Sequence, residues 1–194
     1  MSTFAEIRTD VIAWTNRSKM VAETNMAIKQ AIRTAHKAGK FWRDLQVLPL
    51  TGVSTASAIQ SIDLASSAPF YRQIAYVKPA TLDMQYTAIG IDELFDPDKY
   101  YRLDVYYGVG NALNIRASSP ATSIDIAYYS YPNITDTETF SNWMTANHAD
   151  LITLWAAATM LALVGEQEVK TRVEALSKLA YQDMIDDNIS IAGR

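Results

Sequence analysis

The chain contains no cysteine among its 194 residues, which excludes disulfide bonds, thiolate metal sites and cysteine nucleophiles. No stretch reaches the roughly 18 consecutive apolar residues of a membrane-spanning helix, so no membrane partner is expected. The excess of acidic over basic residues is small. A formal net charge of −4 disfavours tight binding to duplex DNA, because such binding requires several phosphates to be neutralised.

One very apolar helix is the clearest feature that the chain does contain. The residues from Leu151 to Val164 carry no charge, and Thr153 and Thr159 are their only polar side chains. This segment is too short to cross a bilayer and suits a helix that is buried on most sides. A protein of this size seldom buries a helix so thoroughly by itself, so the pattern indicates a partner surface.

Helical patterns fill the first forty residues. Thr3 and Glu6 have the spacing of a capping box, and the apolar residues after them predict a helix to about Asn16. Ser18 is positioned to cap a second helix, and Gly39 to end it. We therefore expect residues 1–40 to form a helical hairpin.

Residues 41–140 have a different composition, rich in Tyr, Ile, Val, Thr and Ser, and helical periodicity largely disappears. Three short runs alternate between apolar and polar residues at roughly ten-residue spacing, which is typical of an antiparallel meander. The runs are Leu103 to Tyr107, Leu113 to Ile115 and Ile124 to Tyr128, and a turn around Gly108 and Gly110 joins the first two.

Residues 141–187 are again helical by pattern. The apolar helix ends near Gly165, and a second, amphipathic helix follows it. Residues 188–194 show no periodicity and predict an extended tail. The fold class is therefore α+β and mainly helical. It is a bundle of N-terminal and C-terminal helices, forming one domain from residues 1–40 and 141–187, with the β-rich part inserted. Six residues are predicted to pack its core: Trp14, Ile28, Trp143, Leu151, Leu154 and Trp155.

No arrangement of residues predicts catalysis, a cofactor or a metal ion. His148 and Asp150 could form half of a relay, but Asp150 is equally placed to stabilise a helix N-terminus. The acids from Asp92 to Asp98 lack the spacing of an EF-hand. A glycine pair after a strand lacks the third glycine of a dinucleotide-binding fingerprint and supports a hairpin instead. We therefore do not expect an enzyme.

Two other interpretations remain open. Lys29, Arg33 and Lys37 lie about four residues apart in the predicted second helix and could make the hairpin a DNA-binding regulator. Eleven tyrosines, several of them doubled, could form a stacking platform in a small enzyme or carbohydrate-binding module. On alternating strands such doublets put one ring inside and one outside, which favours a core with a protein interface.

Four short segments carry a family resemblance, in an order that spans nearly the whole chain. They are Phe41-Trp42 before the β-rich part, then Ser141-Asn142-Trp143-Met144, Ala149-Asp150-Leu151 and, ending the alanine-rich helix, Glu166-Gln167-Glu168. This order resembles that of the head-to-tail adaptors of tailed bacteriophages, the tail accessory or head completion proteins. Ala149 stands where the family pattern usually has proline.

The resemblance implies a structural virion protein at the head-tail junction, assembled in the host cytoplasm. Such adaptors form a homo-oligomeric, dodecameric ring below the portal protein. They extend the DNA channel used in ejection and provide the platform for tail nozzle or tail tube proteins. Genomic DNA passes through without specific binding.

Charge and the tail locate the expected contacts of such a ring. Residues 1–40 have a net charge of +4, whereas residues 41–140 have −5, so acids of the middle section are expected to face the channel. These acids are Asp92, Glu93, Asp96, Asp98 and Asp104. In the tail, Ile189 and Ile191 would add to the portal as an extended strand, together with Arg194.

Overall fold

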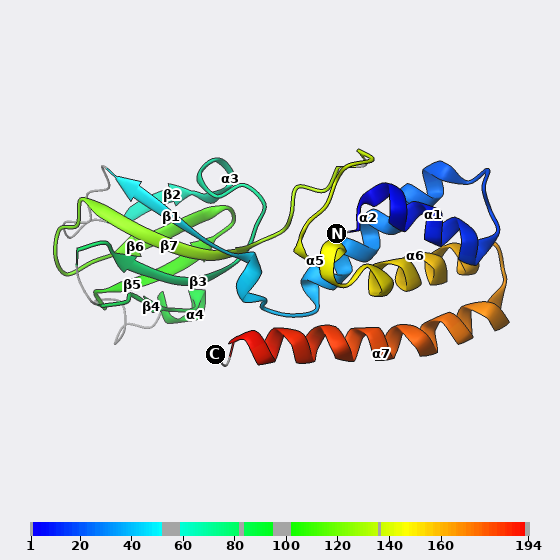
Figure 1. Ribbon diagram of the computed structural model, residues 1–194. Coiled ribbons are helices and arrows are strands. Elements are labelled where there is room, and N and C mark those ends of the chain that lie inside the picture. The colour runs from blue at the N-terminus through cyan, green and yellow to red at the C-terminus, as the bar shows by residue number, and fades with distance from the viewer. Residues whose placement is uncertain (1, 52–58, 82–83, 95–101, 136, 193–194) are drawn as a thin grey trace. The chain divides into compact units, whose positions relative to one another are not determined.

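The computed structural model describes residues 2–51, 59–81, 84–94, 102–135 and 137–192. The chain divides into two compact units, a helical unit formed by Met1–Arg43 with Pro132–Arg194 and a β-rich unit formed by Asp44–Tyr131. The predicted α+β class is confirmed (Figure 1). The inserted unit begins later and ends earlier than expected, so that residues 41–43 and 132–140 belong with the helices.

Helix α1 (Phe4–Thr15) begins with the capping box that the sequence predicted. The Glu6 backbone N–H donates to Thr3 Oγ1 at 3.4 Å, and the Thr3 backbone N–H donates to Glu6 Oε2 at 2.8 Å. Asn16 ends the helix with a φ of 51°, a conformation that asparagine tolerates. The backbone carbonyls of residues 138 and 140 accept hydrogen bonds from the first turn of α1. These bonds connect the N-terminal segment of the helical unit to the segment that follows the insert.

Helix α2 (Val21–Lys37) starts two residues later than a cap at Ser18 would place it. Met20 is its N-cap and makes no side-chain capping bond, so the prediction for Ser18 is wrong. The first turn is closed instead by Thr24, whose backbone N–H and hydroxyl both donate to the Met20 carbonyl.

Helix α6 (Ala149–Leu163) is the centre of the helical unit. It follows the short helix α5 (Trp143–Asn147) and contacts α1, α2 and α7 (Gln167–Ala192), which flank it in Figure 1. Gly165 makes the turn into α7 with a φ of 81°, a conformation that favours glycine. Three neighbouring helices within the unit therefore bury most of the apolar stretch, while Thr159, Ala162 and Leu163 near its end are exposed.

The expected extended tail is wrong for the residues that the structure describes. Helix α7 continues without a break to Ala192, so Ile189 and Ile191 are helical. No proline or glycine stands between Gly165 and Gly193, and adding residues to an existing helix avoids the cost of a new nucleus. Arg194 lies outside the described residues.

The β-rich unit has two sheets. One has the order β1-β7-β3 and is antiparallel: β1 (Leu45–Thr51), β7 (Ser123–Ser130) and β3 (Tyr71–Pro79). The other has the order β2-β6-β5-β4: β2 (Gln60–Asp63), β6 (Ala112–Arg116), β5 (Val105–Val109) and β4 (Thr87–Ala88). The short helices of this unit are α3 (Leu64–Ser67) and α4 (Ile91–Leu94), and the short helix η1 (Trp42–Asp44) is the last element before β1.

The predicted meander is right for two strands and wrong for the third. Strands β5 and β6 form the expected hairpin, with Gly110 at a φ of 59° in its turn. Strand β7, which holds Ile124 to Tyr128, pairs with β1 and β3 instead. The reason is that β6 already has β2 on its other edge, and a strand has only two edges.

Of the six predicted core residues, Ile28, Leu151 and Leu154 are buried in the helical core. Trp143 and Trp155 are partly buried and pack against that core. The prediction for Trp14 is wrong, because 47% of this side chain is exposed.

The buried series of α1 explains the error at Trp14. It runs through Phe4, Ile7, Val11 and Thr15, so threonine takes the inner position. The Thr15 hydroxyl donates to the Val11 carbonyl at 2.8 Å, which satisfies it inside the core.

Candidate functional site

Large apolar side chains are exposed on the outside of the helical unit. Met26 on α2 and Leu179 on α7 are the most exposed of these, at 71% and 68%. Exposed apolar residues that gather beside grooves mark interaction surfaces more reliably than isolated ones. Among the side chains that the structure describes in this unit, the exposed set is Trp14, Val21, Met26, Trp42, Leu163, Val169, Leu176 and Leu179.

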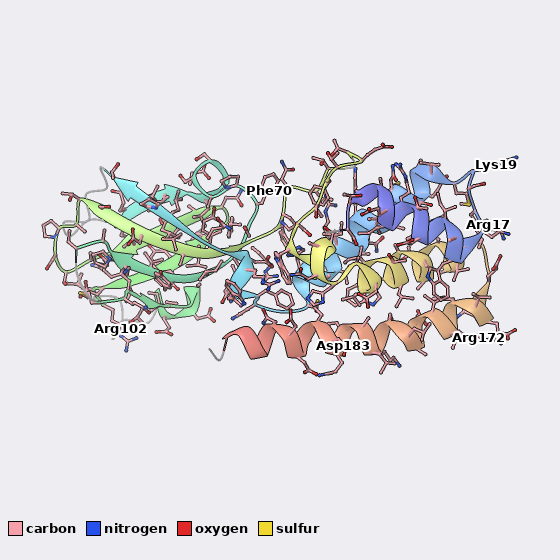
Figure 2. All side chains as sticks on the ribbon, in the orientation of Figure 1. Arg17, Lys19, Phe70, Arg102, Arg172 and Asp183 are labelled. Atoms are coloured by element: carbon pink, nitrogen blue, oxygen red, sulfur yellow. The ribbon has the colours of Figure 1, made fainter. Side chains whose placement is uncertain are left out.

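A groove with an acidic border runs between α1 and α7, with α6 as its floor. Its volume is about 510 Å³. Trp14, Leu176 and Leu179 provide large apolar surfaces, and three exposed aspartates accompany them. We call it the acidic groove; it is lined by Asp10, Ala13, Trp14, Asp150, Thr153, Leu154, Leu176, Leu179, Ala180 and Asp183. Figure 2 labels Asp183 on α7.

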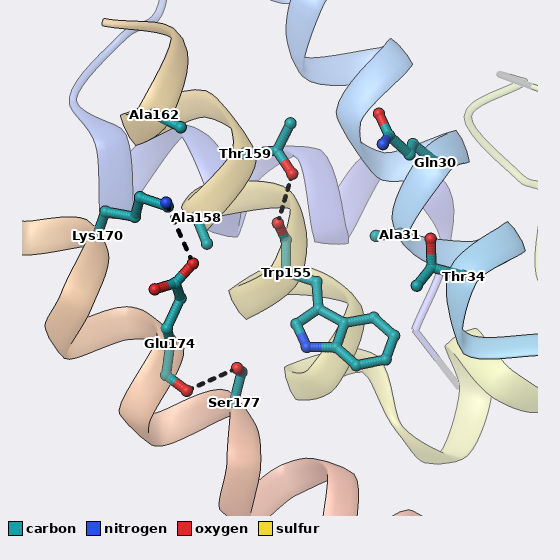
Figure 3. A pocket seen from close by; sticks show the side chains of 10 residues that line it. All are labelled: Gln30, Ala31, Thr34, Trp155, Ala158, Thr159, Ala162, Lys170, Glu174 and Ser177. Atoms are coloured by element: carbon teal, nitrogen blue, oxygen red, sulfur yellow. Dashed lines mark hydrogen bonds and ion pairs between the residues drawn. The ribbon is translucent and has the colours of Figure 1, made fainter. Parts of the chain in front are cut away.

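A second groove, of about 440 Å³, lies on the other flank of α7, between α7 and α2 (Figure 3). Lys170 pairs with Glu174 across one turn of α7 at 3.4 Å, so the charges of this groove are balanced internally. Trp155 lies on its floor and stacks on Tyr181 with 5.9 Å between ring centroids. Helix α7 thus has open grooves on both flanks.

The outward face of α2 is basic. Met26, Arg33 and Lys37 recur at helical spacing and are exposed, while Ile28 and Ile32 on the opposite face are buried. We call the three exposed residues the basic ridge. A groove of about 540 Å³ beside Met26 is also lined by Leu163 from the end of α6, so the apolar surface continues from one helix to the other.

Trp143 is the centre of a mostly buried aromatic cluster. Its ring makes edge contacts with Phe41, His36 and His148, with centroid distances of 5.2, 5.5 and 6.0 Å. The Arg43 guanidinium lies 5.4 Å from the same ring. Both histidines of the chain are therefore packing partners of one tryptophan.

Hydrogen bonds orient the first histidine. The backbone N–H of Thr145 donates to Asn142 Oδ1 at 2.8 Å, so the Asn142 amide nitrogen faces His36. This amide donates to His36 Nε2 at 3.1 Å. The network therefore assigns an acceptor role to Nε2 and places the imidazole proton on Nδ1.

The second histidine faces the C-terminal half of α7. His148 Nε2 lies 3.5 Å from Asp187 Oδ2, within ion-pair distance, but it has no hydrogen-bond partner among the described residues. His148 lines none of the grooves above, and Asp150 stands in the first turn of α6, as the capping interpretation expects. Over the described ranges, no cluster of acids and histidines could hold a metal ion.

The acids expected at the channel have different local roles. Asp92 is exposed, whereas Glu93 pairs with Arg102 at 3.4 Å. Asp104 has a φ of 60°, and its carboxylate accepts hydrogen bonds from the backbone N–H and the hydroxyl of Ser118. Asp96 and Asp98 lie outside the described residues. Asp104 therefore forms local hydrogen bonds with Ser118, which the spacing of the acids alone could not predict.

Two tyrosines near the end of β7, Tyr129 and Tyr131, make cation–π contacts with an arginine side chain. The Arg72 guanidinium lies 5.6 Å from the ring centroid of Tyr129 and 5.8 Å from that of Tyr131. Tyr106 is half-buried on β5, and this burial raises the pKa of its phenol. Some of the tyrosine surface is thus already used within the unit.

Comparison with known proteins gives no family: no family model matches the chain, and no curated protein matches it. Of the helices in the described ranges, none is both long and apolar enough to cross a membrane.

Proposed function

We propose that this protein is a head-to-tail adaptor of a tailed bacteriophage. In this proposal, copies of the chain form a dodecameric ring below the portal protein and extend the channel through which the genome passes. The ring would then offer an attachment platform to the tail nozzle or tail tube. The protein acts as a structural part of the virion and does not bind DNA specifically.

The apolar exterior of the helical unit is the observation that carries this proposal. Leu179 and Met26 are more than two-thirds exposed, although α6 behind them is enclosed by three helices. Leaving such side chains in water forgoes about 1.5–3 kcal/mol each relative to full burial. A unit with a complete core and apolar flanks is well suited to packing against other subunits.

The order of elements supports the same proposal. Helices from both ends of the chain form one unit, and a β-rich unit is inserted between them, which is the order that suggested the adaptor family. The portal contact is proposed at the end of α7, the segment that includes Ile189 and Ile191. Docking by strand addition loses its basis, because these residues are helical.

Electron microscopy of the purified protein, alone and mixed with the portal protein of the same virus, tests the proposal. We expect a closed ring, or an added layer of ring-shaped density on the portal. Monomers in both samples, with no added density, would contradict it.

A truncation separates the portal contact from the ring. Removing residues 188–194 should leave the thermal unfolding of the protein unchanged but weaken its co-sedimentation with the portal. Equal co-sedimentation of the truncated chain would remove the end of α7 from that contact.

A DNA-binding regulator remains the competing function, because Arg33 and Lys37 are exposed on one face of α2. Such a protein would bind duplex DNA with an affinity that falls steeply as salt is raised. Fluorescence anisotropy with a labelled duplex at two salt concentrations distinguishes the two functions.

A further inference from the structure

We propose that the acidic groove of one copy receives the basic ridge of the next copy. This proposal rests on the ring described above and identifies the two surfaces from which the ring would be built.

Charge is the first argument for this pairing. The acidic groove contains Asp10, Asp150 and Asp183, all exposed. Helix α2 has a single acid, Glu23 in its first turn, and its outward face presents Arg33 and Lys37. Opposite charges on two surfaces steer them together and fix their register, whereas two copies of either surface would repel each other.

Apolar surface is the second argument. Trp14, Leu176 and Leu179 lie in the acidic groove, and Met26 stands on the ridge beside Leu163. The acidic groove therefore combines large apolar side chains with charge of one sign. On the ridge side, Glu23 also lines the groove beside Met26, but Arg33 and Lys37 outnumber it. This is the composition of an interface with an apolar core and a polar rim.

The two surfaces cannot satisfy each other within one chain. The groove lies between α1 and α7, whereas the ridge is the face of α2 turned away from the buried residues Ile28 and Ile32. Contact therefore requires a second copy. Because the two surfaces differ, the interface is heterologous, and such an interface closes into a ring when its rotation divides a full turn.

The groove between α2 and α7 is a weaker candidate for the same role. Its Lys170 and Glu174 already pair with each other, so it has no charge bias for a partner to complement. The acidic groove is the one whose border charges match another surface of the same chain.

Charge reversal on each surface tests the pairing. The groove variant carries Asp10→Lys and Asp183→Lys, and the ridge variant carries Arg33→Glu and Lys37→Glu. The self-association of each variant alone should be weaker by a factor of about ten or more, because like charges would meet across the interface. Mass photometry and electron microscopy measure assembly in the presence and absence of portal. Lys19→Glu and Asp92→Lys are the controls for a single charge reversal, since both residues are exposed and lie outside the two surfaces. They are compared with the single substitutions Arg33→Glu and Asp183→Lys.

Mixing the two variants gives the decisive result. A lysine-bearing groove complements a glutamate-bearing ridge, and the unchanged acidic groove complements the unchanged ridge. An equal mixture should therefore regain ring assembly with the two variants alternating. A misfolded variant could not be rescued in this way, so recovery distinguishes a broken interface from a broken fold.

The absence of cysteine permits a direct check of proximity. A chain carrying both Met26→Cys and Leu179→Cys has no other thiol, so oxidation should yield a ladder of covalent oligomers. A chain carrying only one of these substitutions should give no ladder beyond a dimer.

The outcomes separate this inference from the adaptor function. If the wild-type protein forms rings and neither charge variant changes them, the interface lies elsewhere and only this inference is overturned. If assembly depends on both surfaces but the portal gains no density, the adaptor function is overturned and this pairing stands. Absence of self-association under all conditions overturns both. If the ridge variant loses salt-sensitive DNA binding while its assembly is unchanged, the ridge binds DNA and the pairing is wrong.

Discussion

The helical unit and the β-rich unit expose apolar residues in different ways. In the helical unit, Trp14, Leu176 and Leu179 line one groove, and Met26 and Leu163 line another. Among the described residues of the β-rich unit, the large exposed apolar side chains are spread over different elements and turns: Val47, Ile59, Phe70, Met84, Leu103 and Val109. Only gathered apolar surface can be covered by one partner, and this difference is why the proposed self-assembly is placed in the helical unit.

The two units also differ in how the chain builds them. The helical unit joins segments from both ends of the sequence, whereas the β-rich unit is continuous. All four tryptophans (Trp14, Trp42, Trp143 and Trp155) belong to the helical unit. Tryptophan fluorescence therefore follows unfolding of that unit alone, and circular dichroism follows both.

The largest expected effect is on the helical core. Leu151 is fully buried, so Leu151→Ala should lower the free energy of unfolding of the helical unit by about 2–5 kcal/mol. Urea unfolding followed by tryptophan fluorescence should show the loss. Thr159→Ala on the exposed side of the same helix is the control and should change little. An unchanged midpoint for Leu151→Ala would mean that α6 is not the core of the unit.

A matching substitution in the other unit makes the comparison stricter. Ile126 is fully buried at the centre of β7, and Ile126→Ala should cost about 2–5 kcal/mol in the β-rich unit. The part of the circular dichroism change that tryptophan fluorescence does not follow should move to lower urea, while the tryptophan transition stays in place. If both transitions move together, the two units unfold as one.

The capping box of α1 gives a smaller effect. Thr3→Ala removes the hydroxyl that caps the helix and should cost about 1 kcal/mol in the tryptophan transition. Thr3→Ser keeps the hydroxyl and should retain most of the stability. Equal losses for the two variants would show that the cap contributes nothing.

The smallest expected effect is a pH dependence at Glu6. Hydrogen bonds from the Thr3 backbone N–H and hydroxyl lower the pKa of the Glu6 carboxyl. Its contribution to stability is therefore present above the ordinary glutamate pKa and disappears as the pH falls through the lowered value. Glu6→Gln should flatten the corresponding part of the curve of urea midpoint against pH. An identical curve for the variant would contradict the assignment.

Local signals in the sequence predicted local structure well. The capping box at Thr3, the hairpin turn near Gly110 and the turn at Gly165 each depend on a few neighbouring residues, and all three appear in the structure. The α+β class followed from the change of periodicity between the middle of the chain and its ends.

Features that depend on distant partners were not predictable in this way. The place of β7 depends on which strand edges are already paired. Trp14 differs from Thr15 by one helical position, and only the packing of α6 decides which one points inward. The cluster around Trp143 joins residues about a hundred positions apart, which no local pattern could predict. Only its helix start carried a local signal, because Asn142 is a residue that favours the N-cap position. Continuation of α7 could have been anticipated from the absence of a breaker before Gly193.

The pairing of β1 with β7 has a consequence for how this chain could change. Leu45, at the start of the inserted unit, is opposite Tyr129, near its end. Paired residues on antiparallel strands lie only about 5 Å apart, so the first and last residues of the insert are close together. An insert of this kind can be lengthened, shortened or exchanged between genomes while its two attachment points stay fixed. In the proposed adaptor, the insert would then change without any change to the helical unit, which carries the proposed ring contacts.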